Sequence, residues 1–326
     1  MGRSFARIGS GAVAALSAAV VLAACGGSSS SSSSSSSTSA TSSSSSGASA
    51  ATGPGKGKPA VTIGDKNFTE EFILGELYAQ ALRAKGYNVT VKSNIGSSEI
   101  IDKSLTGNAI QMYPDYVGTI LSVLAHQNTS PTSAAATYQA AKRFEQSRGF
   151  TLLDATPFYD TNAVATLPAY AQKNHLTTIA DLKKAGSFKY ADTPENLNRL
   201  QGVMGLRQVY GLTNLKFVPL AIGLQYPALT RGDVQTADVF STDAQLTQTK
   251  LTILTDTKHI FGFQNVAPIV SPKVLAAEGP AFAQTINAVS AKLTTPAVQS
   301  LNAAVAIDKH QPAAVAQAFL KANGLA

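Results

Sequence analysis

Apolar positions along most of the chain switch between the short runs of a strand and the wider spacing of a helix. Residues 60–64 (AVTIG) form a short apolar run, and the apolar residues of 72–82 then recur with the period of a helix. Asn67, with Glu70 three residues later, predicts the capped start of that helix, and Gly86 predicts its end. This stretch therefore predicts a strand followed by a helix.

The same alternation continues along the chain. Further strands are predicted at 87–92, 110–113, 163–167, 188–191 and 237–240. Helical stretches lie between them, including one that begins near Val117, and the region from about Pro272 is Ala-rich and helical. Strands that alternate with helices of this size predict an α/β fold with parallel sheets.

The N-terminal region departs from this pattern. Two arginines precede an uncharged apolar stretch that ends in LAAC at residues 22–25, which predicts a bacterial secretory signal over residues 1–24. LAAC resembles the lipobox of bacterial lipoproteins, and this implies that Cys25 carries diacylglycerol; the alternative is an ordinary cleaved signal with an incidental cysteine. Residues 25–59 are almost all Ser, Gly, Ala and Thr, which predicts a disordered tether.

Composition excludes several function classes. Hydrophobic residues make up 44% and charged residues 14%, and the formal net charge of +7 is not gathered into a basic stripe, so no nucleic-acid partner is expected. With one cysteine and four scattered histidines, the sequence predicts no metal site, and no cofactor is expected. It also shows no Ser/His/Asp set and no nucleotide-binding loop, so we do not expect an enzyme.

Several polar residues follow the carboxyl ends of predicted strands. Lys66 and Asn67 follow the first strand, and Tyr116 and Thr119 follow the third. In open α/β sheets ligands bind outside those ends, where helix N-termini favour an anion. The residues alone therefore predict an anion-accepting crevice with an aromatic ring beside it. The alternative is that Tyr116 is a packed aromatic and Lys66 a solvated loop charge.

Four blocks of sequence carry a resemblance to a known family. They are 63–70 (IGDKNFTE), 96–99 (GSSE), 113–119 (YPDYVGT) and 240–243 (FSTD). Together they resemble the glycine betaine/carnitine/choline-binding subunits of osmoprotectant ABC importers, and the resemblance extends from about Val61 to Leu325. It implies a two-lobed, type II periplasmic-binding-protein (Venus-flytrap) fold with two crossover strands, near 159–163 and 261–266.

The resemblance also implies how the lobes divide and what they do. Residues 60–161 and 264–326 would form lobe I and residues 162–263 lobe II, with a ligand trapped as the lobes close. The implied function is that of an extracytoplasmic solute-binding lipoprotein, lipid-anchored to the bacterial cell membrane. It would capture a betaine-type zwitterion and deliver it to an ABC permease and its ATPase subunits. A solute-sensing lipoprotein that is not coupled to transport is an alternative.

Roles for individual residues follow from the same resemblance. A quaternary ammonium group is recognised by the faces of aromatic rings, and a carboxylate by basic and hydroxyl groups. Lys66 and Thr119 are implied as carboxylate contacts, and Arg199 as the basic partner from the second lobe. Tyr116 is implied as the first wall of an aromatic cage, and Asp160 as an opposing charge or hydrogen-bond partner beside the ammonium.

The chain departs from the family where relatives have tyrosines. It has Asn162, Phe240 and Gln264 at these positions, of which only Phe240 offers an aromatic face. Losing two faces predicts a trimethylammonium site weakened by about 1–4 kcal/mol. Nearby aromatic residues that could replace them are Phe158, Tyr159, Phe261 and Phe263. Alternatively the pocket serves a more polar zwitterion, such as a histidine-derived betaine or an amino-acid-like solute.

Overall fold

The computed structural model describes residues 53–127 and 131–326. The predicted signal peptide at 1–24, Cys25 and most of the predicted tether at 25–59 lie outside these ranges. Residues 53–59, which the sequence assigns to the tether, form turns beside the first strand, and the N–H of Gly55 donates to the carbonyl of Lys85 at 3.0 Å. The folded region therefore begins before residue 60.

The first of two five-stranded sheets combines the N-terminal strands with one strand from late in the chain. Its strands, in spatial order, are β2 (Asn88–Lys92), β1 (Ala60–Gly64), β3 (Met112–Tyr116), β10 (Val266–Val270) and β4 (Thr151–Leu152). β1 runs parallel to β2 and β3, whereas β10 runs antiparallel to both of its neighbours. The prediction of parallel strands therefore holds for β1, β2 and β3 but not for β10, which reaches this sheet directly from the second sheet rather than through a helix.

The second sheet is built from the middle of the chain and repeats the same plan. Its strands, in spatial order, are β7 (Leu215–Pro219), β6 (Phe188–Asp192), β8 (Thr236–Phe240), β5 (Asn162–Thr166) and β9 (Thr252–Leu254). β6 runs parallel to β7 and β8, and β5 runs antiparallel to β8 and β9. We call the part built on the first sheet lobe I and the part built on the second sheet lobe II.

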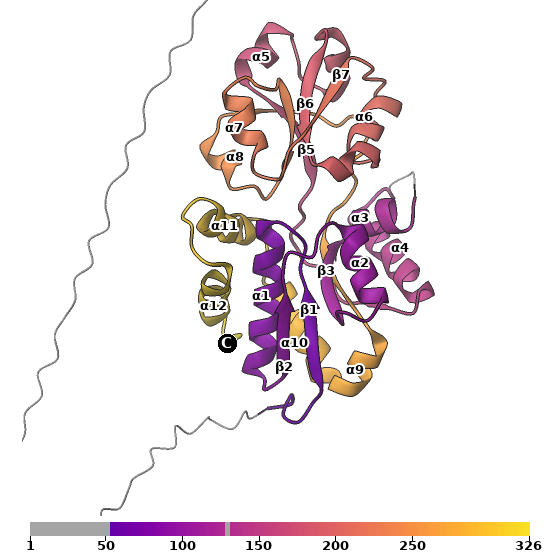
Figure 1. Cartoon of the computed structure of the whole chain (residues 1–326), viewed down its shortest axis with the longest axis vertical. Helices are drawn as coiled ribbons and strands as arrows, with labels where there is room; N and C mark the ends of the chain where they lie inside the picture. Colours follow the sequence, from indigo (N-terminus) through magenta and orange to yellow (C-terminus); the bar gives the residue numbers. More distant parts are fainter. Residues whose placement is uncertain (1–52, 128–130) are drawn as a thin grey trace, which may run out of the picture. The chain divides into compact units, whose positions relative to one another are not determined.

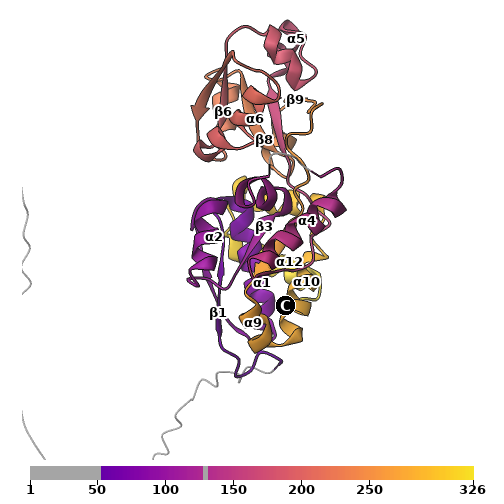
Figure 2. The same cartoon turned by 90° about the vertical axis from the view of Figure 1, so that its right-hand side faces the viewer.

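Helices cover both sheets. Those of lobe I are α1 (Thr69–Ala84), α2 (Ser98–Thr106), α3 (Val117–Thr119), η1 (Ile120–Leu124), α4 (Ala134–Ser147), α9 (Pro272–Glu278), α10 (Pro280–Ser290), α11 (Thr295–Ala306) and α12 (Pro312–Ala322). Those of lobe II are α5 (Pro168–Lys173), η2 (Ile179–Lys184), η3 (Pro194–Asn198), α6 (Val203–Gln208), α7 (Gln225–Thr230) and α8 (Gln245–Gln248). The C-terminal helices α10, α11 and α12 pack against α1 (Figure 1 and Figure 2). Among the described residues, no helix is both long and apolar enough to span a membrane.

β3 ends three residues beyond its predicted end at Tyr113 and passes through a proline. Its Pro114 lies opposite Pro268 of β10, and three positions further along the ladder the N–H of Val117 donates to the carbonyl of Asn265 at 2.9 Å. Because hydrogen-bonded and non-bonded pairs alternate in an antiparallel ladder, the two prolines form a non-bonded pair and no ladder bond is lost. Tyr116 is therefore the last residue of the strand rather than part of the loop after it.

The chain passes between the sheets twice. It leaves β4 at 152 and enters β5 at 162, and it leaves β9 at 254 and enters β10 at 266. The two connections pair side by side through a Tyr159–Asn265 bridge, and the N–H of Asp160 donates to the carbonyl of Gln264 at 3.1 Å (Figure 1). The two-lobed fold with two crossover strands is thus confirmed.

Each lobe has its own hydrophobic core. Leu77, Tyr78 and Phe282 belong to the core of lobe I, and Phe188 and Tyr210 to a core of lobe II. Residues from the two lobes do not mix in these clusters. Because the crossovers and a small set of polar contacts join the lobes, the lobes can move relative to each other without disturbing either core.

Candidate functional site

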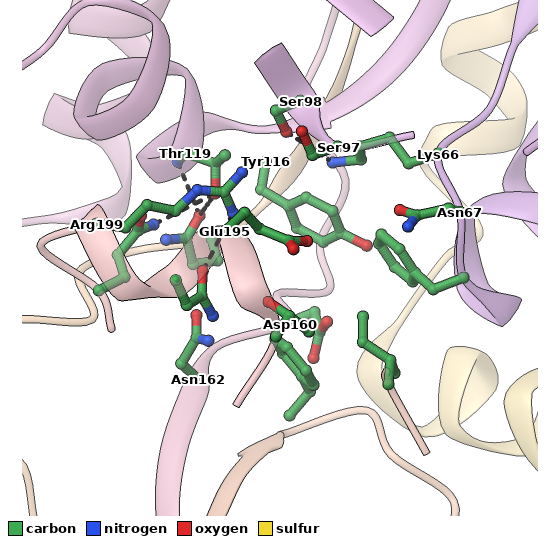
Figure 3. A pocket seen from close by; sticks show the side chains of 17 residues that line it. Lys66, Asn67, Ser97, Ser98, Tyr116, Thr119, Asp160, Asn162, Glu195 and Arg199 are labelled. Atoms are coloured by element: carbon green, nitrogen blue, oxygen red, sulfur yellow. Dashed lines mark hydrogen bonds between the residues drawn. The ribbon is translucent and has the colours of Figure 1, made fainter. Parts of the chain in front are cut away.

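A cleft with about 600 Å³ of empty space, part of it open to solvent, lies where the lobes meet. This cleft is lined by all eight residues that we expected from the sequence to bind a ligand: Lys66, Tyr116, Thr119, Asp160, Asn162, Arg199, Phe240 and Gln264. Figure 3 shows labelled side chains from both lobes around this one space. The remaining lining residues, which the sequence did not propose, include Phe68, Ser97, Ser98, Thr193, Glu195, Asn196 and Gln201.

Strand ends explain why these residues meet. Lys66 follows β1 and Tyr116 ends β3, while Thr193 follows β6 and Phe240 ends β8. The carboxyl ends of all four strands therefore open toward the same cleft, as expected for ligand sites in α/β sheets.

Lys66 is buried in lobe I and already has ionic partners. Its Nζ lies 2.6 Å from Oδ1 of Asp115 and 3.5 Å from Oε1 of Glu71, and it donates to Oγ of Ser98 at 3.4 Å. Burial works to lower the pKa of Lys66, but the attraction of Asp115 and Glu71 outweighs it and raises the pKa above its usual value. Lys66 is therefore not a solvated loop charge, and its charge is largely offset before any ligand arrives.

Tyr116 forms an aromatic wall together with a residue that the sequence analysis missed. Its ring stacks on that of Phe68 with centroids 6.2 Å apart, and Nζ of Lys66 lies 4.3 Å from the Tyr116 centroid. Phe68 lies inside the family-like block 63–70, in the loop between β1 and α1, so that block was the signal available in the sequence. Of the aromatic residues proposed as replacements, Phe158, Tyr159, Phe261 and Phe263, none lines this cleft.

Glu70 ties the aromatic wall to the rest of the molecule. Its buried carboxylate accepts hydrogen bonds from the Tyr116 hydroxyl at 2.7 Å, the Thr242 hydroxyl at 2.6 Å and the Asn302 amide at 2.8 Å. The predicted capping box with Asn67 is wrong, because α1 is preceded by Phe68, which provides no side-chain cap. Glu70 faces the interior instead and links β3 to lobe II and to α11.

Two acidic side chains of the cleft lack a cationic partner. Among the described residues, neither Asp160 nor Glu195 forms an ion pair with a lysine, arginine or histidine. Asp160 is buried, and its Oδ1 accepts the N–H of Thr242 at 3.2 Å. Burial, followed by repulsion from Glu70 and Asp243, raises the pKa of Asp160 well above its usual value.

Asn162 and Gln264, the two amides for which the resemblance implies tyrosines in relatives, both line the cleft. Asn162 donates to Oδ2 of Asp238 at 2.8 Å, and Gln264 accepts the N–H of Thr119 at 3.1 Å. Gly118 permits the second contact, because a Cβ there would lie 2.7 Å from the Gln264 side chain. The amide groups are therefore engaged in part with the protein itself.

Arg199 bridges the lobes. It follows η3 in lobe II, and its Nη2 and Nε donate to the two carboxylate oxygens of Glu99 in α2 at 2.6 and 3.2 Å. Its Nη1 donates to the side-chain oxygen of Asn196 at 3.2 Å, and the Ser97 hydroxyl donates to Glu99 at 2.6 Å. Burial works to raise the pKa of Glu99, but hydrogen bonding and attraction from Arg199 outweigh it and lower the pKa.

Gln201 adds a neutral bridge between the lobes near the same side of the cleft. The Ser122 hydroxyl donates to its side-chain oxygen at 2.7 Å, and its amide donates to the Thr119 hydroxyl at 3.3 Å. Within residues 53–127 and 131–326, no group of three His, Cys, Asp or Glu side chains is placed to hold a metal ion. Apart from the aliphatic Ile222, the described groups of the cleft are aromatic, amide, hydroxyl and ionic.

Comparison with known proteins places this site in context. Residues 59–322 match the family described as "Substrate binding domain of ABC-type glycine betaine transport system". The glycine-betaine-binding protein of Pseudomonas aeruginosa is 31% identical over 275 residues, which cover 81% of this chain and 88% of that protein. An ergothioneine transport permease/ergothioneine binding protein, EgtU of Helicobacter pylori, is 27% identical over 82% of this chain and 48% of its own length. A crystal structure of a glycine betaine/carnitine/choline ABC transporter superposes with a TM-score of 0.65 at 25% identity, covering 81% of this chain and 99% of that one.

Proposed function

This chain belongs to the family of substrate-binding domains of ABC-type glycine betaine transport systems, and from that premise we propose that its cleft captures a small solute bearing a quaternary ammonium group. It is a solute-binding protein of the extracytoplasmic type. The solute would be held between lobes I and II and passed to an ABC permease. The relatives are solute-binding proteins rather than enzymes, so we propose that the ligand leaves chemically unchanged.

The observation that carries this proposal is that aromatic faces lie in the same cleft as acids which, among the described residues, have no cationic partner. Phe68, Tyr116 and Phe240 line the same cleft as Asp160 and Glu195. A quaternary ammonium group has no N–H to donate, so ring faces and nearby carboxylates are the groups that recognise it. Phe68 adds a third aromatic face to those of Tyr116 and Phe240, and such a face contributes about 0.5–2 kcal/mol to the binding of a cation.

Charge balance supports the same proposal. Ionised Asp160 is unfavourable in the empty cleft, because it is buried and its acidic neighbours Glu70 and Asp243 repel it. A ligand cation beside Asp160 would relieve that repulsion. A neutral solute would leave it in place, so the cleft favours ligands with a positive end.

Binding would favour a closed arrangement of the lobes. Lys66, Tyr116 and Thr119 belong to lobe I, whereas Arg199 and Phe240 belong to lobe II. A ligand that contacts both sets binds the closed state more tightly than an open one, and it therefore shifts the population toward closure. The Tyr159–Asn265 pairing of the crossovers is the natural hinge.

A second candidate ligand is a more polar betaine or an amino-acid-like solute. Asn162 and Gln264 favour it, because they place amide groups on the cleft where an aromatic cage would be apolar. Among the described residues, the side-chain oxygen of Asn162 accepts no hydrogen bond from the protein. That oxygen can therefore accept a bond from a ligand N–H.

A thermal-shift screen separates the two candidates. The panel consists of glycine betaine, choline, carnitine, ergothioneine and unmethylated amino acids, each added to the purified protein at several concentrations. Under the main proposal, the aliphatic quaternary ammonium compounds give concentration-dependent stabilisation and the unmethylated amino acids give none. Stabilisation by ergothioneine alone would keep the quaternary ammonium group and select the more polar betaine. Stabilisation by unmethylated amino acids alone would replace the main proposal with an amino-acid-like solute, and no response from any compound would contradict both candidates.

We further propose that Cys25, which lies outside the described residues, anchors the protein to the membrane through a lipid. The LAAC sequence at 22–25 supports this. Expressed in a bacterial host, the protein should incorporate labelled fatty acid and remain with the membrane fraction, whereas Cys25→Ser should do neither. Equal labelling of both forms would contradict the anchor. Loss of solute uptake on deletion of the gene would support transport over a purely sensing role.

A further inference from the structure

Only two of the described lysine and arginine side chains line the cleft, and protein carboxylates already engage both. Lys66 lies between Asp115 and Glu71, and Arg199 is bound by Glu99. A ligand carboxylate that seeks a cationic partner in this cleft must therefore compete with a carboxylate of the protein. The two pairs differ in how easily they can be exchanged.

The pair of Lys66 with Asp115 is buried and is not easily exchanged. The side chains of Lys66 and Asp115 are 4% and 0% exposed, so displacing Asp115 would leave a buried carboxylate without its cationic partner. The Arg199 pair is open to exchange, because the Glu99 side chain is 42% exposed and can be hydrated once it is released. Arg199 is thus the cation that a ligand can take over.

The geometry of the Arg199 pair makes the competition direct. Glu99 occupies the Nε and Nη2 donors of the guanidinium together, and Asn196 takes an Nη1 donor. A planar guanidinium binds a carboxylate best through two parallel N–H bonds. A ligand carboxylate that binds Arg199 in the same way as Glu99 has to displace it, whereas a ligand without a carboxylate leaves the pair intact.

We propose that Glu99 is a specificity-determining residue that holds Arg199 in place of a ligand carboxylate, and so biases the cleft toward quaternary ammonium ligands without a carboxylate. The inference rests on the proposed function, because it concerns the same cleft. Glu99 also belongs to lobe I while Arg199 belongs to lobe II, so the pair is a direct contact between the lobes. Breaking that contact would change the affinity for every ligand, whereas relief of competition would change it only for carboxylates.

The test is calorimetric titration of native protein and Glu99→Gln with choline and with glycine betaine. The informative quantity is the ratio of the Kd for choline to the Kd for glycine betaine, because any effect on lobe opening is common to both ligands and cancels. We expect Glu99→Gln to raise this ratio about tenfold in favour of glycine betaine, the size of one charge-assisted contact. An unchanged or lowered ratio would overturn the inference.

Two further variants separate competition from a general effect of charge. Glu76→Gln removes a carboxylate of lobe I that lies beside Arg83 and outside the cleft, and it should leave the ratio unchanged. In an Arg199→Ala background, Glu99→Gln should have no effect on the ratio, because the guanidinium for which Glu99 and the ligand carboxylate compete has been removed. A shift in either experiment as large as that in the native background would overturn the inference.

Failure of the inference and failure of the proposed function give different results. If native protein binds glycine betaine and Glu99→Gln has the same ratio, only the role of Glu99 is wrong. If neither native protein nor Glu99→Gln binds choline or glycine betaine, the proposed function is wrong and the inference falls with it. If only choline binds to both forms, the assignment of Arg199 to a ligand carboxylate is overturned.

Discussion

The two walls of the cleft are built in different ways. On the lobe I wall, Lys66 and Tyr116 are 3% and 6% exposed, and each is fixed by buried carboxylates, namely Asp115 and Glu71 for Lys66 and Glu70 for Tyr116. On the lobe II wall, Arg199, Glu195 and Phe240 are half-buried. Lobe I therefore offers a preformed half-site, whereas the groups of lobe II have room to rearrange around a ligand.

Because of this difference, the cleft combines a fixed wall on lobe I with an adjustable wall on lobe II. A preformed aromatic face spares the ligand the cost of ordering it, which improves affinity. The partly exposed pair Arg199–Glu99 and Glu195, which forms no ion pair among the described residues, lose less hydration than a buried pair, so they can exchange partners as the lobes close. Loss of a lobe I group should therefore damage the fold, whereas loss of a lobe II group should mainly alter binding.

The largest expected effect tests the ionic groups of the two walls. Lys66→Met leaves Asp115 buried without its partner, so the free energy of unfolding should fall by about 3–5 kcal/mol. The matched change Arg199→Met breaks a partly exposed pair and should lower it by less than about 1 kcal/mol. Urea unfolding followed by circular dichroism measures both. Equal losses would show that the two walls are not built differently.

The next effect concerns the aromatic groups. Tyr116→Ala removes a buried ring face and should weaken binding of a quaternary ammonium ligand by about 2 kcal/mol, while Phe240→Ala removes a half-buried one and should cost about 0.5–1 kcal/mol. Calorimetry with choline gives both values. Tyr116→Phe serves as the control, since it keeps the ring and loses only the bond to Glu70. A larger loss of affinity for Phe240→Ala than for Tyr116→Ala would show that lobe II, and not lobe I, supplies the main aromatic face.

A smaller effect is expected in the proton balance of binding. Burial, with Glu70 and Asp243 nearby, raises the pKa of Asp160 well above its usual value, so the empty cleft favours its protonated form. A cation favours the ionised form, so binding should release up to about one proton, and affinity should rise with pH until Asp160 is ionised before binding. Calorimetry of choline binding in two buffers of different ionisation enthalpy measures the release. Asp160→Asn should abolish it, and release that persists in this variant would assign the proton to another group.

The sequence predicted the elements of the cleft better than their contacts. β1 falls on the apolar run 60–64, and the strand-end rule together with the family-like blocks brought all eight proposed residues to one cleft. The extent of β3 was missed because a proline usually ends a strand, and Pro114 is tolerated only through its pairing with Pro268. The pairing depends on the distant strand β10, which no local pattern reveals.

The missed contacts share the same cause. Lys66 pairs with Asp115, 49 residues away, and Arg199 pairs with Glu99, 100 residues away. Neither separation leaves a periodic signal in one sequence. Glu195 had no motif to mark it, and Asn67 and Glu70 had the spacing of a capping box although tertiary contacts direct Glu70 elsewhere. Tertiary packing thus overrode local patterns where the site is formed.

The most direct test of quaternary ammonium recognition is a calorimetric comparison of glycine betaine with glycine, two ligands that share a carboxylate and differ in the three methyl groups on nitrogen. If aromatic faces and an unpaired acid recognise a quaternary ammonium group, glycine betaine should bind with a saturable heat and glycine should bind at least about a hundredfold more weakly. Equal affinities for the two compounds, or tighter binding of glycine, would contradict recognition through the ring faces of Phe68, Tyr116 and Phe240.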